Sequence, residues 1–147
     1  MIWVINSNSN TCKIYDYQKK PSKLILIKEL SHPENKLKKS DYFTTDKPGH
    51  FSTNGSAHGS YSQRSDPKEV GVDNFAREIA KELDHGRMNR AYEKLILITP
   101  PHVNGLLNQH MNDNVRSLIS HNIHKELLHL TDLELMEFLR EHVKFQE

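Results

Sequence analysis

The side chains best suited to chemistry gather in one polar stretch, at about residues 44–65. This stretch is rich in Gly, Ser, Asn and His and nearly empty of aliphatic residues, so it must lie at the surface. Its glycines allow a close backbone approach to a ligand, and the cations in and beside it suit phosphate groups. We interpret it as a flexible RNA-binding loop; the alternative is a solvent-exposed loop without a partner. The candidates are Gly49, His50, Gly55, His58 and Gly59 in the loop and Lys47, Arg64 and Lys68 for phosphate.

The same search predicts no metal site and no cofactor. A two-metal nuclease needs clustered carboxylates at the ends of neighbouring strands. The first and fourth apolar runs of this chain end instead at Asn6 and Thr99, which carry no charge. Ten histidines are present, but His121 and His124 would point to opposite faces of a strand. Surface or core-edge histidines are therefore the better interpretation.

Composition and charge indicate a soluble protein of a reducing compartment. The 147 residues have a formal net charge of +1, with nine lysines and five acidic residues in residues 1–50. That weak basic excess either meets phosphate or forms a solvated face. The single cysteine, Cys12, has no helix N-terminus or base beside it that would activate a nucleophile. No segment resembles a signal peptide or a membrane span, so we expect a cytoplasmic protein without a membrane partner.

The polar loop is followed by the best-marked helix of the sequence, which begins at Asp66. Asp66 can cap this helix, Pro67 suits its first turn, and Glu69 can reach back to the backbone amide of the cap residue. His85 and Gly86 mark its expected end. One face is apolar at the three-four spacing typical of a helix packed on a core. This face contains Val72, Phe75, Ala76, Ile79, Ala80 and Leu83.

Five runs that alternate or are apolar throughout predict strands. These runs are residues 2–5, 12–17, 24–27, 95–98 and 115–124. The first two form a hairpin, and the third is expected antiparallel to the second. A short helix is predicted over residues 103–110, and a capping box at Thr131 and Glu134 begins a last helix. The apolar face of that last helix contains Leu135, Phe138, Leu139 and His142.

The resulting order is βββαβαβα, three meandering strands followed by alternating helices and strands. Such an order predicts a mixed sheet with helices on both faces. We therefore predict one α/β domain over residues 1–147, with the three layers of a ribonuclease H-like fold.

Several segments resemble the bacterial host attachment protein family, also described as proteins required for attachment to host cells. They are residues 46–51 (DKPGHF), 66–69 (DPKE), 75–80 (FAREIA) and 95–101 (LILITPP). That family is similar to the middle domain of archaeo-eukaryotic peptide-chain release factors, where a loop carrying Gly-Gly-Gln precedes a long helix and promotes peptidyl-tRNA hydrolysis. Here Gln63 follows Tyr61 and Ser62, and the chain has no Gly-Gly pair. By loop position alone, the resemblance implies that Gln63 is the catalytic residue that orients water.

Two hypotheses follow. In the first, the protein is an RNA- or ribosome-associated module whose loop enters near the acceptor end of a tRNA, with Arg64 or Lys68 on phosphate. In the second, it is a non-catalytic protein-interaction factor that contributes to attachment to host cells. Binding driven by phosphate should weaken steeply as salt rises, whereas binding to a protein should resist both ribonuclease and moderate salt.

Overall fold

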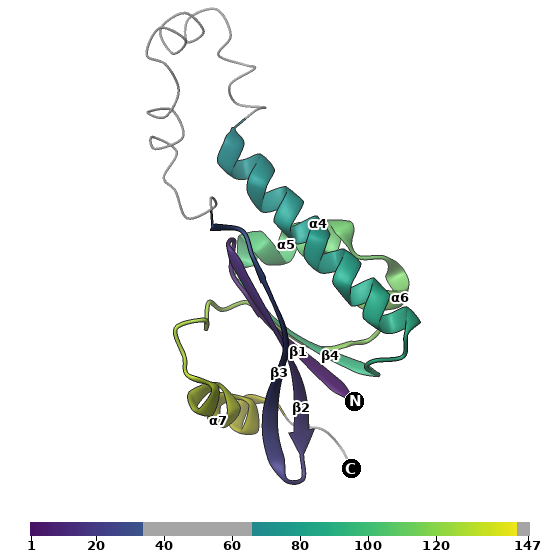
Figure 1. The fold of residues 1–147 in the computed structure, drawn as a ribbon, viewed down its shortest axis with the longest axis vertical. Helices are drawn as coiled ribbons and strands as arrows, with labels where there is room; N and C mark the ends of the chain where they lie inside the picture. The colour runs from purple at the N-terminus through teal and green to yellow at the C-terminus, as the bar shows by residue number, and fades with distance from the viewer. Residues whose placement is uncertain (34–65, 144–147) are drawn as a thin grey trace, which may run out of the picture.

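The computed structural model describes residues 1–33 and 66–143. They form a five-stranded mixed sheet with helices on both of its faces (Figure 1). In chain order the elements are β1 (Ile2–Ser7), β2 (Thr11–Lys19), β3 (Ser22–Ser31), α4 (Pro67–Met88), β4 (Lys94–Ile98), α5 (Pro101–His110), α6 (Asp113–Arg116), β5 (Ile119–Ile123) and α7 (Asp132–His142).

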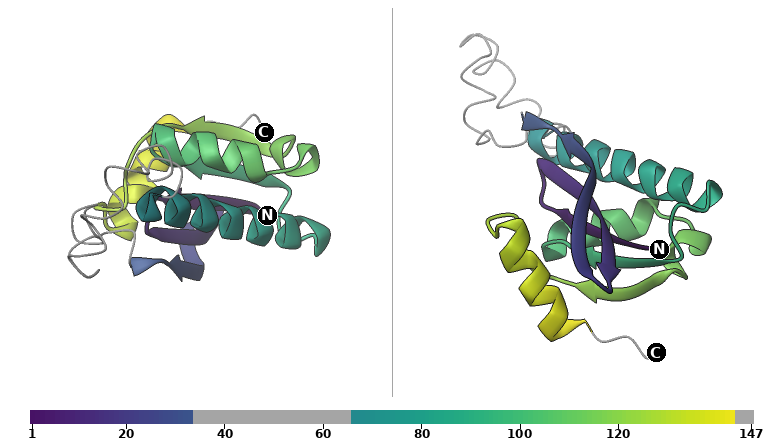
Figure 2. Two further views of the ribbon diagram at one scale, coloured as in Figure 1. Left: turned by 90° about the horizontal axis from the view of Figure 1, so that it is seen from above. Right: turned by 60° about the horizontal axis from the view of Figure 1, so that its bottom comes forward.

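The strands lie in the order β3-β2-β1-β4-β5. β2 runs antiparallel to both β1 and β3, whereas β4 runs parallel to β1 and β5 parallel to β4. α4, α5 and α6 cover one face of the sheet and α7 covers the other (Figure 2). This arrangement confirms the predicted mixed α/β architecture, the β1–β2 hairpin and the antiparallel third strand.

Two apolar clusters, one on each face, hold these layers together. Because side chains alternate along a strand, Trp3 and Ile5 of β1 face α4 while Val4 faces α7. On the α7 side, the hydroxyl of Tyr15 donates a hydrogen bond to Asp132 Oδ1 at 2.9 Å. This bond fixes the start of α7 over the sheet.

The predicted end of the long helix at Gly86 is wrong, because α4 continues to Met88. Gly86 is instead a buried contact point: a Cβ atom there would lie 2.5 Å from Cη2 of Trp3 and 3.1 Å from Cε1 of Tyr92. The helix ends only where Arg90 adopts a φ of 58°, in the left-handed region. Gly86 therefore serves close helix–sheet packing and not helix termination.

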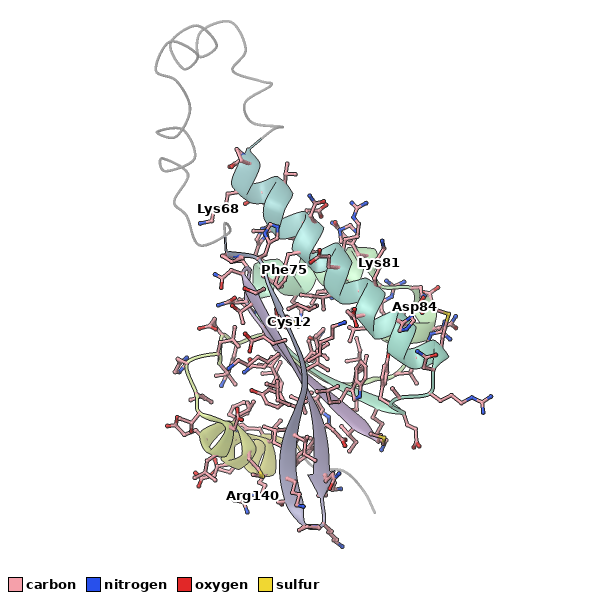
Figure 3. The ribbon with its side chains drawn as sticks, in the orientation of Figure 1. Cys12, Lys68, Phe75, Lys81, Asp84 and Arg140 are labelled. Carbon is pink, nitrogen blue, oxygen red and sulfur yellow. The ribbon has the colours of Figure 1, made fainter. Side chains whose placement is uncertain are left out.

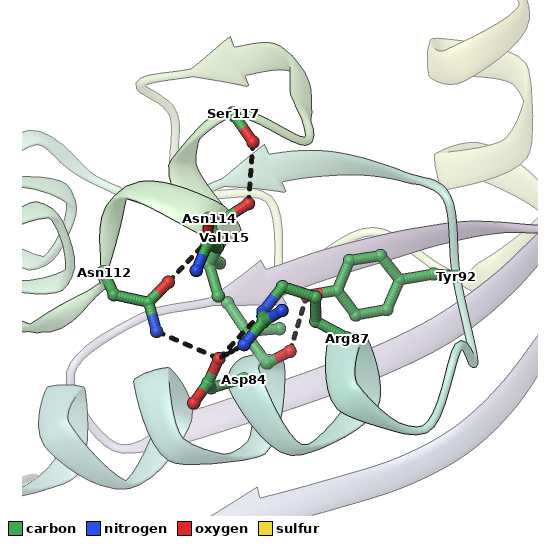
Figure 4. A network of polar contacts seen from close by, with 8 residues as sticks. Asp84, Arg87, Tyr92, Asn112, Asn114, Val115 and Ser117 are labelled. Atoms are coloured by element: carbon green, nitrogen blue, oxygen red, sulfur yellow. Dashed lines mark hydrogen bonds and ion pairs between the residues drawn. The ribbon is translucent and has the colours of Figure 1, made fainter.

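The predicted strand over residues 115–124 is also too long, since its first residues belong to the short helix α6 (Figure 4). Asn112 caps this turn through a 2.9 Å bond from the Val115 amide to its Oδ1 atom. Asn112 Nδ2 also donates to Asp84 Oδ1 of α4 at 3.0 Å. The hydrogen bond from Asn112 holds the pKa of the Asp84 carboxyl below its usual value, and Arg87 adds to this effect. Within residues 1–33 and 66–143 the order is thus βββαβααβα, with one helix more than predicted for them.

Two local predictions need further correction. Glu69 does not cap α4; its Oε2 lies 3.3 Å from Nε2 of His102 on α5, and the Asp66 carboxylate accepts from the Lys68 amide at 3.0 Å. β3 is longer than predicted, and its pairing with β2 shifts by one residue, which leaves Ile27 as a bulge between Leu26 and Lys28.

Candidate functional site

A polar pocket of about 640 Å³ lies where β1 ends and α4 begins. It occupies the carboxyl end of a parallel strand, the place where open α/β sheets bind ligands. Figure 3 shows Lys68 at the start of α4, above this end of the strands. The described residues that line the pocket are Asn8, Ser9, Asn10, Thr11, Lys13, Glu29, Lys68 and Leu128.

The turn between β1 and β2 presents hydrogen-bond donors to this pocket. Asn8 Oδ1 accepts from the amides of Asn10 and Thr11, both at 2.9 Å. Asn10 Oδ1 accepts from Thr11 Oγ1 at 3.0 Å. No described residue accepts a hydrogen bond from Nδ2 of Asn8 or Asn10. The side-chain oxygens of Asn8 and Asn10 therefore accept hydrogen bonds within the turn, while their Nδ2 groups remain to donate to a ligand.

Three side chains form a row across β1, β2 and β3 beside the pocket, and two of them, Lys13 and Glu29, line it. Asn6 is paired with Lys13, and Lys13 with Glu29, so all three lie on the α7 side of the sheet. Asn6 is 2% exposed, and its Nδ2 donates to the carbonyl of Leu127 at 3.3 Å, next to pocket residue Leu128. Its Oδ1 is buried and has no partner among the described residues.

Two cations meet at the pocket, Lys13 from β2 and Lys68 from the first turn of α4. Neither forms an ion pair with another described residue. The backbone amides at the start of α4 add a partial positive charge near Lys68. Glu29 supplies one negative charge, so the described lining carries a net single positive charge together with free amide donors.

A second polar cluster lies on the opposite side of the sheet, at the ends of β4 and β5. Asn104 Nδ2 donates to Thr99 Oγ1 at 2.9 Å and to Asn122 Oδ1 at 2.5 Å. Asn108 Nδ2 donates to Asn104 Oδ1 at 3.0 Å. These amides satisfy one another, so the cluster ties α5 to the sheet and offers little to a ligand.

The titratable groups considered from the sequence lie apart from one another. His110 Nε2 contacts Asp73 Oδ1 at 2.8 Å between α5 and α4, whereas His121 lies on β5, where burial lowers its pKa. The Cys12 thiol is fully buried, and burial raises its pKa to about 12. In residues 1–33 and 66–143, no three His, Cys, Asp or Glu side chains gather where they would hold a metal ion.

Only one predicted site residue falls within the described chain: Lys68, which the structure places in the pocket lining. The other predicted residues lie outside the described residues; they are Lys47, Gly49, His50, Gly55, His58, Gly59, Gln63 and Arg64. Sequence reasoning missed Asn8, Asn10, Lys13 and Glu29. The Asn-Ser-Asn-Ser-Asn run directly after an apolar strand could have indicated Asn8 and Asn10.

No helix among the described residues is long and apolar enough to cross a membrane. A comparison with curated proteins found no match to this chain. Residues 3–139 match a protein family described as protein required for attachment to host cells. That match runs from the second residue of β1 to Leu139 in α7. The chain therefore belongs to the family of proteins required for attachment to host cells.

Proposed function

We propose that this host-attachment family protein binds RNA phosphate in the pocket between the β1–β2 turn and the start of α4. The observation that carries the proposal is the donor-rich lining described above. Lys13, Lys68 and the Nδ2 atoms of Asn8 and Asn10 are all donors, and phosphate oxygens are pure acceptors. An RNA ligand also explains the single acid, because Glu29 can accept from a ribose hydroxyl or a base amino group.

The pocket has a suitable size for this ligand, since small-molecule sites measure roughly 300–1,000 Å³. Nuclease chemistry is not part of the proposal. The two strand ends that would hold divalent ions carry the neutral side chains of Asn6 and Thr99. Asn6 is engaged with the Leu127 carbonyl, and Thr99 with the Asn104 amide. The protein thus binds RNA without cleaving it by a two-metal mechanism.

A more specific role follows from the family resemblance. We propose a ribonuclease H-like fold similar to a release-factor middle domain, which the strand order β3-β2-β1-β4-β5 supports. In this role the protein is cytoplasmic and associates with ribosomes or tRNA. Gln63 and Arg64 lie four and three residues before the start of α4 in the sequence, and five and four residues before Lys68. RNA held at Lys68 would then meet them, with Gln63 orienting water toward peptidyl-tRNA and Arg64 contacting phosphate.

The direct test is fluorescence anisotropy of labelled tRNA titrated with the wild type, Lys13→Ala, Lys68→Ala and the control Lys81→Ala. Lys81 is an exposed lysine on α4, away from the pocket. We expect each pocket variant to bind about tenfold more weakly and to reduce the salt slope by about 1, because each removes one phosphate contact. Lys81→Ala should match the wild type. Equal affinities for all four proteins would refute the pocket assignment.

The ribosomal role needs a separate test. Sedimentation of native lysate through a sucrose gradient should show co-migration with ribosomes that Lys68→Ala weakens. Purified ribosomes carrying peptidyl-tRNA should then report hydrolysis that Gln63→Ala abolishes. Unchanged cleavage in Gln63→Ala removes the hydrolytic step but leaves RNA binding intact. Capture of a partner that resists both ribonuclease and moderate salt would instead support the non-catalytic protein-interaction function.

A further inference from the structure

Strand β3 exposes three consecutive large apolar side chains at the edge of the sheet. Ile25, Leu26 and Ile27 are 45%, 46% and 47% exposed, and β3 pairs only with β2 among the described strands. An edge strand presents unpaired backbone N–H and C=O groups that can accept another strand. The strand order places β3 at one edge of the sheet, and Figure 1 shows it in the β2–β3 hairpin, which runs toward the bottom of the view beside α7.

The directions of these side chains show what shape of partner fits. Ile25 is paired with Asp16 and Leu26 with Tyr15, so the two side chains point to opposite faces of the sheet. A flat surface such as a lipid bilayer would cover one of them and leave the other exposed. A strand added along the edge passes beside both at once.

The bulge at Ile27 sets the length of the site. Residues 22–26 pair with residues 15–19 of β2 in one unbroken register, and the register shifts between Leu26 and Lys28. Because a bulge disrupts the ladder and bends the strand, the regular edge covers about five residues. A partner strand of similar length would complete it.

The charge of this segment distinguishes between two kinds of added strand, one from a second copy of this chain and one that is acidic. Residues 18–28 contain four lysines and no acidic residue. Lys28 is held by Glu82 of α4, with Nζ and Oε1 2.7 Å apart, while Lys23 is exposed beside the apolar segment. A second copy would bring the same positive segment against this one, and like charges directly opposite each other destabilise strand pairing. An acidic strand gains attraction at the same positions.

We propose that the β3 edge is a docking site for an extended, acidic segment of a partner protein, which adds as a sixth strand beside residues 22–26. Apolar side chains of that segment would pack on Ile25 and Leu26, and a carboxylate would meet Lys23. This site lies on β3 outside the RNA pocket, so an experiment that refutes one proposal leaves the other unaffected.

The test uses the full chain and a fluorescein-labelled glutamate–valine peptide in which two adjacent valines, which point to opposite faces of a strand, are flanked by glutamates. We expect saturable binding by fluorescence anisotropy with a Kd tighter than about 1 mM. The double variant Ile25→Thr/Leu26→Thr places a residue of high strand propensity at both positions but removes the apolar contacts, and Lys23→Glu reverses the charge. Each should weaken binding about tenfold. The matched controls, Val70→Thr at an equally exposed site on α4 and Lys81→Glu, should bind as the wild type does.

Further probes separate strand addition from other modes. A peptide N-methylated at alternate amides cannot complete the ladder and should not bind. Hydrogen exchange at residues 22–26 should slow when the unmodified peptide is bound. Equal binding of a lysine–valine peptide, or no binding of the glutamate–valine peptide, would overturn the proposal. Concentration-dependent dimers lost in Leu26→Thr, or binding to phosphatidylserine vesicles in place of the peptide, would overturn it too.

Discussion

The same substitution should have opposite effects at two helical glycines of this protein. Gly86 in α4 and Gly105 in α5 both lie inside helices, where alanine is favoured over glycine by about 1 kcal/mol. At Gly105 a new Cβ would have no atom within 4 Å apart from its chain neighbours and the backbone of its own helix. Gly105→Ala should therefore raise the free energy of unfolding by about 0.5–1 kcal/mol.

At Gly86 the new methyl group would overlap an aromatic side chain. Its Cβ would lie 2.5 Å and 2.8 Å from two ring atoms of Trp3, which is buried and packs against Tyr92 with ring centroids 4.7 Å apart. Because the indole is buried and packed against Tyr92, we assign an overpacking cost near the upper part of the usual range of about 1–3 kcal/mol. After the helix-propensity gain, Gly86→Ala should lose about 1–2 kcal/mol.

The free energy of unfolding is measured by urea titration and Tm by thermal unfolding. Both are monitored by circular dichroism and by the fluorescence of Trp3, the only tryptophan of the chain. For a chain of this size, 1 kcal/mol corresponds to about 4 °C in Tm. Gly86→Ala should thus unfold about 4–8 °C below the wild type and Gly105→Ala about 2–4 °C above it. In a Trp3→Phe background, the penalty at Gly86 should shrink by about 1 kcal/mol or more. A Gly86→Ala protein as stable as the wild type would falsify the packing argument.

Three other perturbations test separate contacts. Tyr15→Phe removes the bond to Asp132 that joins the sheet to α7, so urea unfolding should show a loss of about 1 kcal/mol. The hydrogen bond from His110 holds the pKa of the Asp73 carboxyl below its usual value of 3.8. Its stabilising effect is therefore present above about pH 4 and is lost as the pH falls through the folded-state pKa. Asp73→Asn should flatten the pH dependence of Tm in that acidic range and leave the remaining slope unchanged. The Cys12 thiol, fully buried and with its pKa raised to about 12, should react with a thiol reagent at pH 8 only as fast as the protein opens, and rapid labelling of the folded protein would contradict this.

Local signals in the sequence were sufficient for most of the elements. The Thr131–Glu134 capping box is present in both directions, at 3.1 Å and 2.8 Å, and α7 begins where it predicts. The apolar face of α4 and the apolar run of β4 are buried as expected. These features depend on residues close together in the chain, whose spacing alone sets helix or strand periodicity and capping.

Tertiary contacts decided the rest, because they join residues far apart in sequence. Gly86 was predicted to end the long helix, but in the fold it allows the helix to approach Trp3 closely. Lys13 and Glu29 became parts of one pocket with Lys68 only through the register of three strands and the position of α4. The exposure of Ile25 and Leu26 follows from the position of β3 at the sheet edge; the same apolar run in a central strand, as in β4, is buried. The sequence by itself thus determined most of the helices and strands, while the order of the strands decided which side chains meet a ligand and which meet the core.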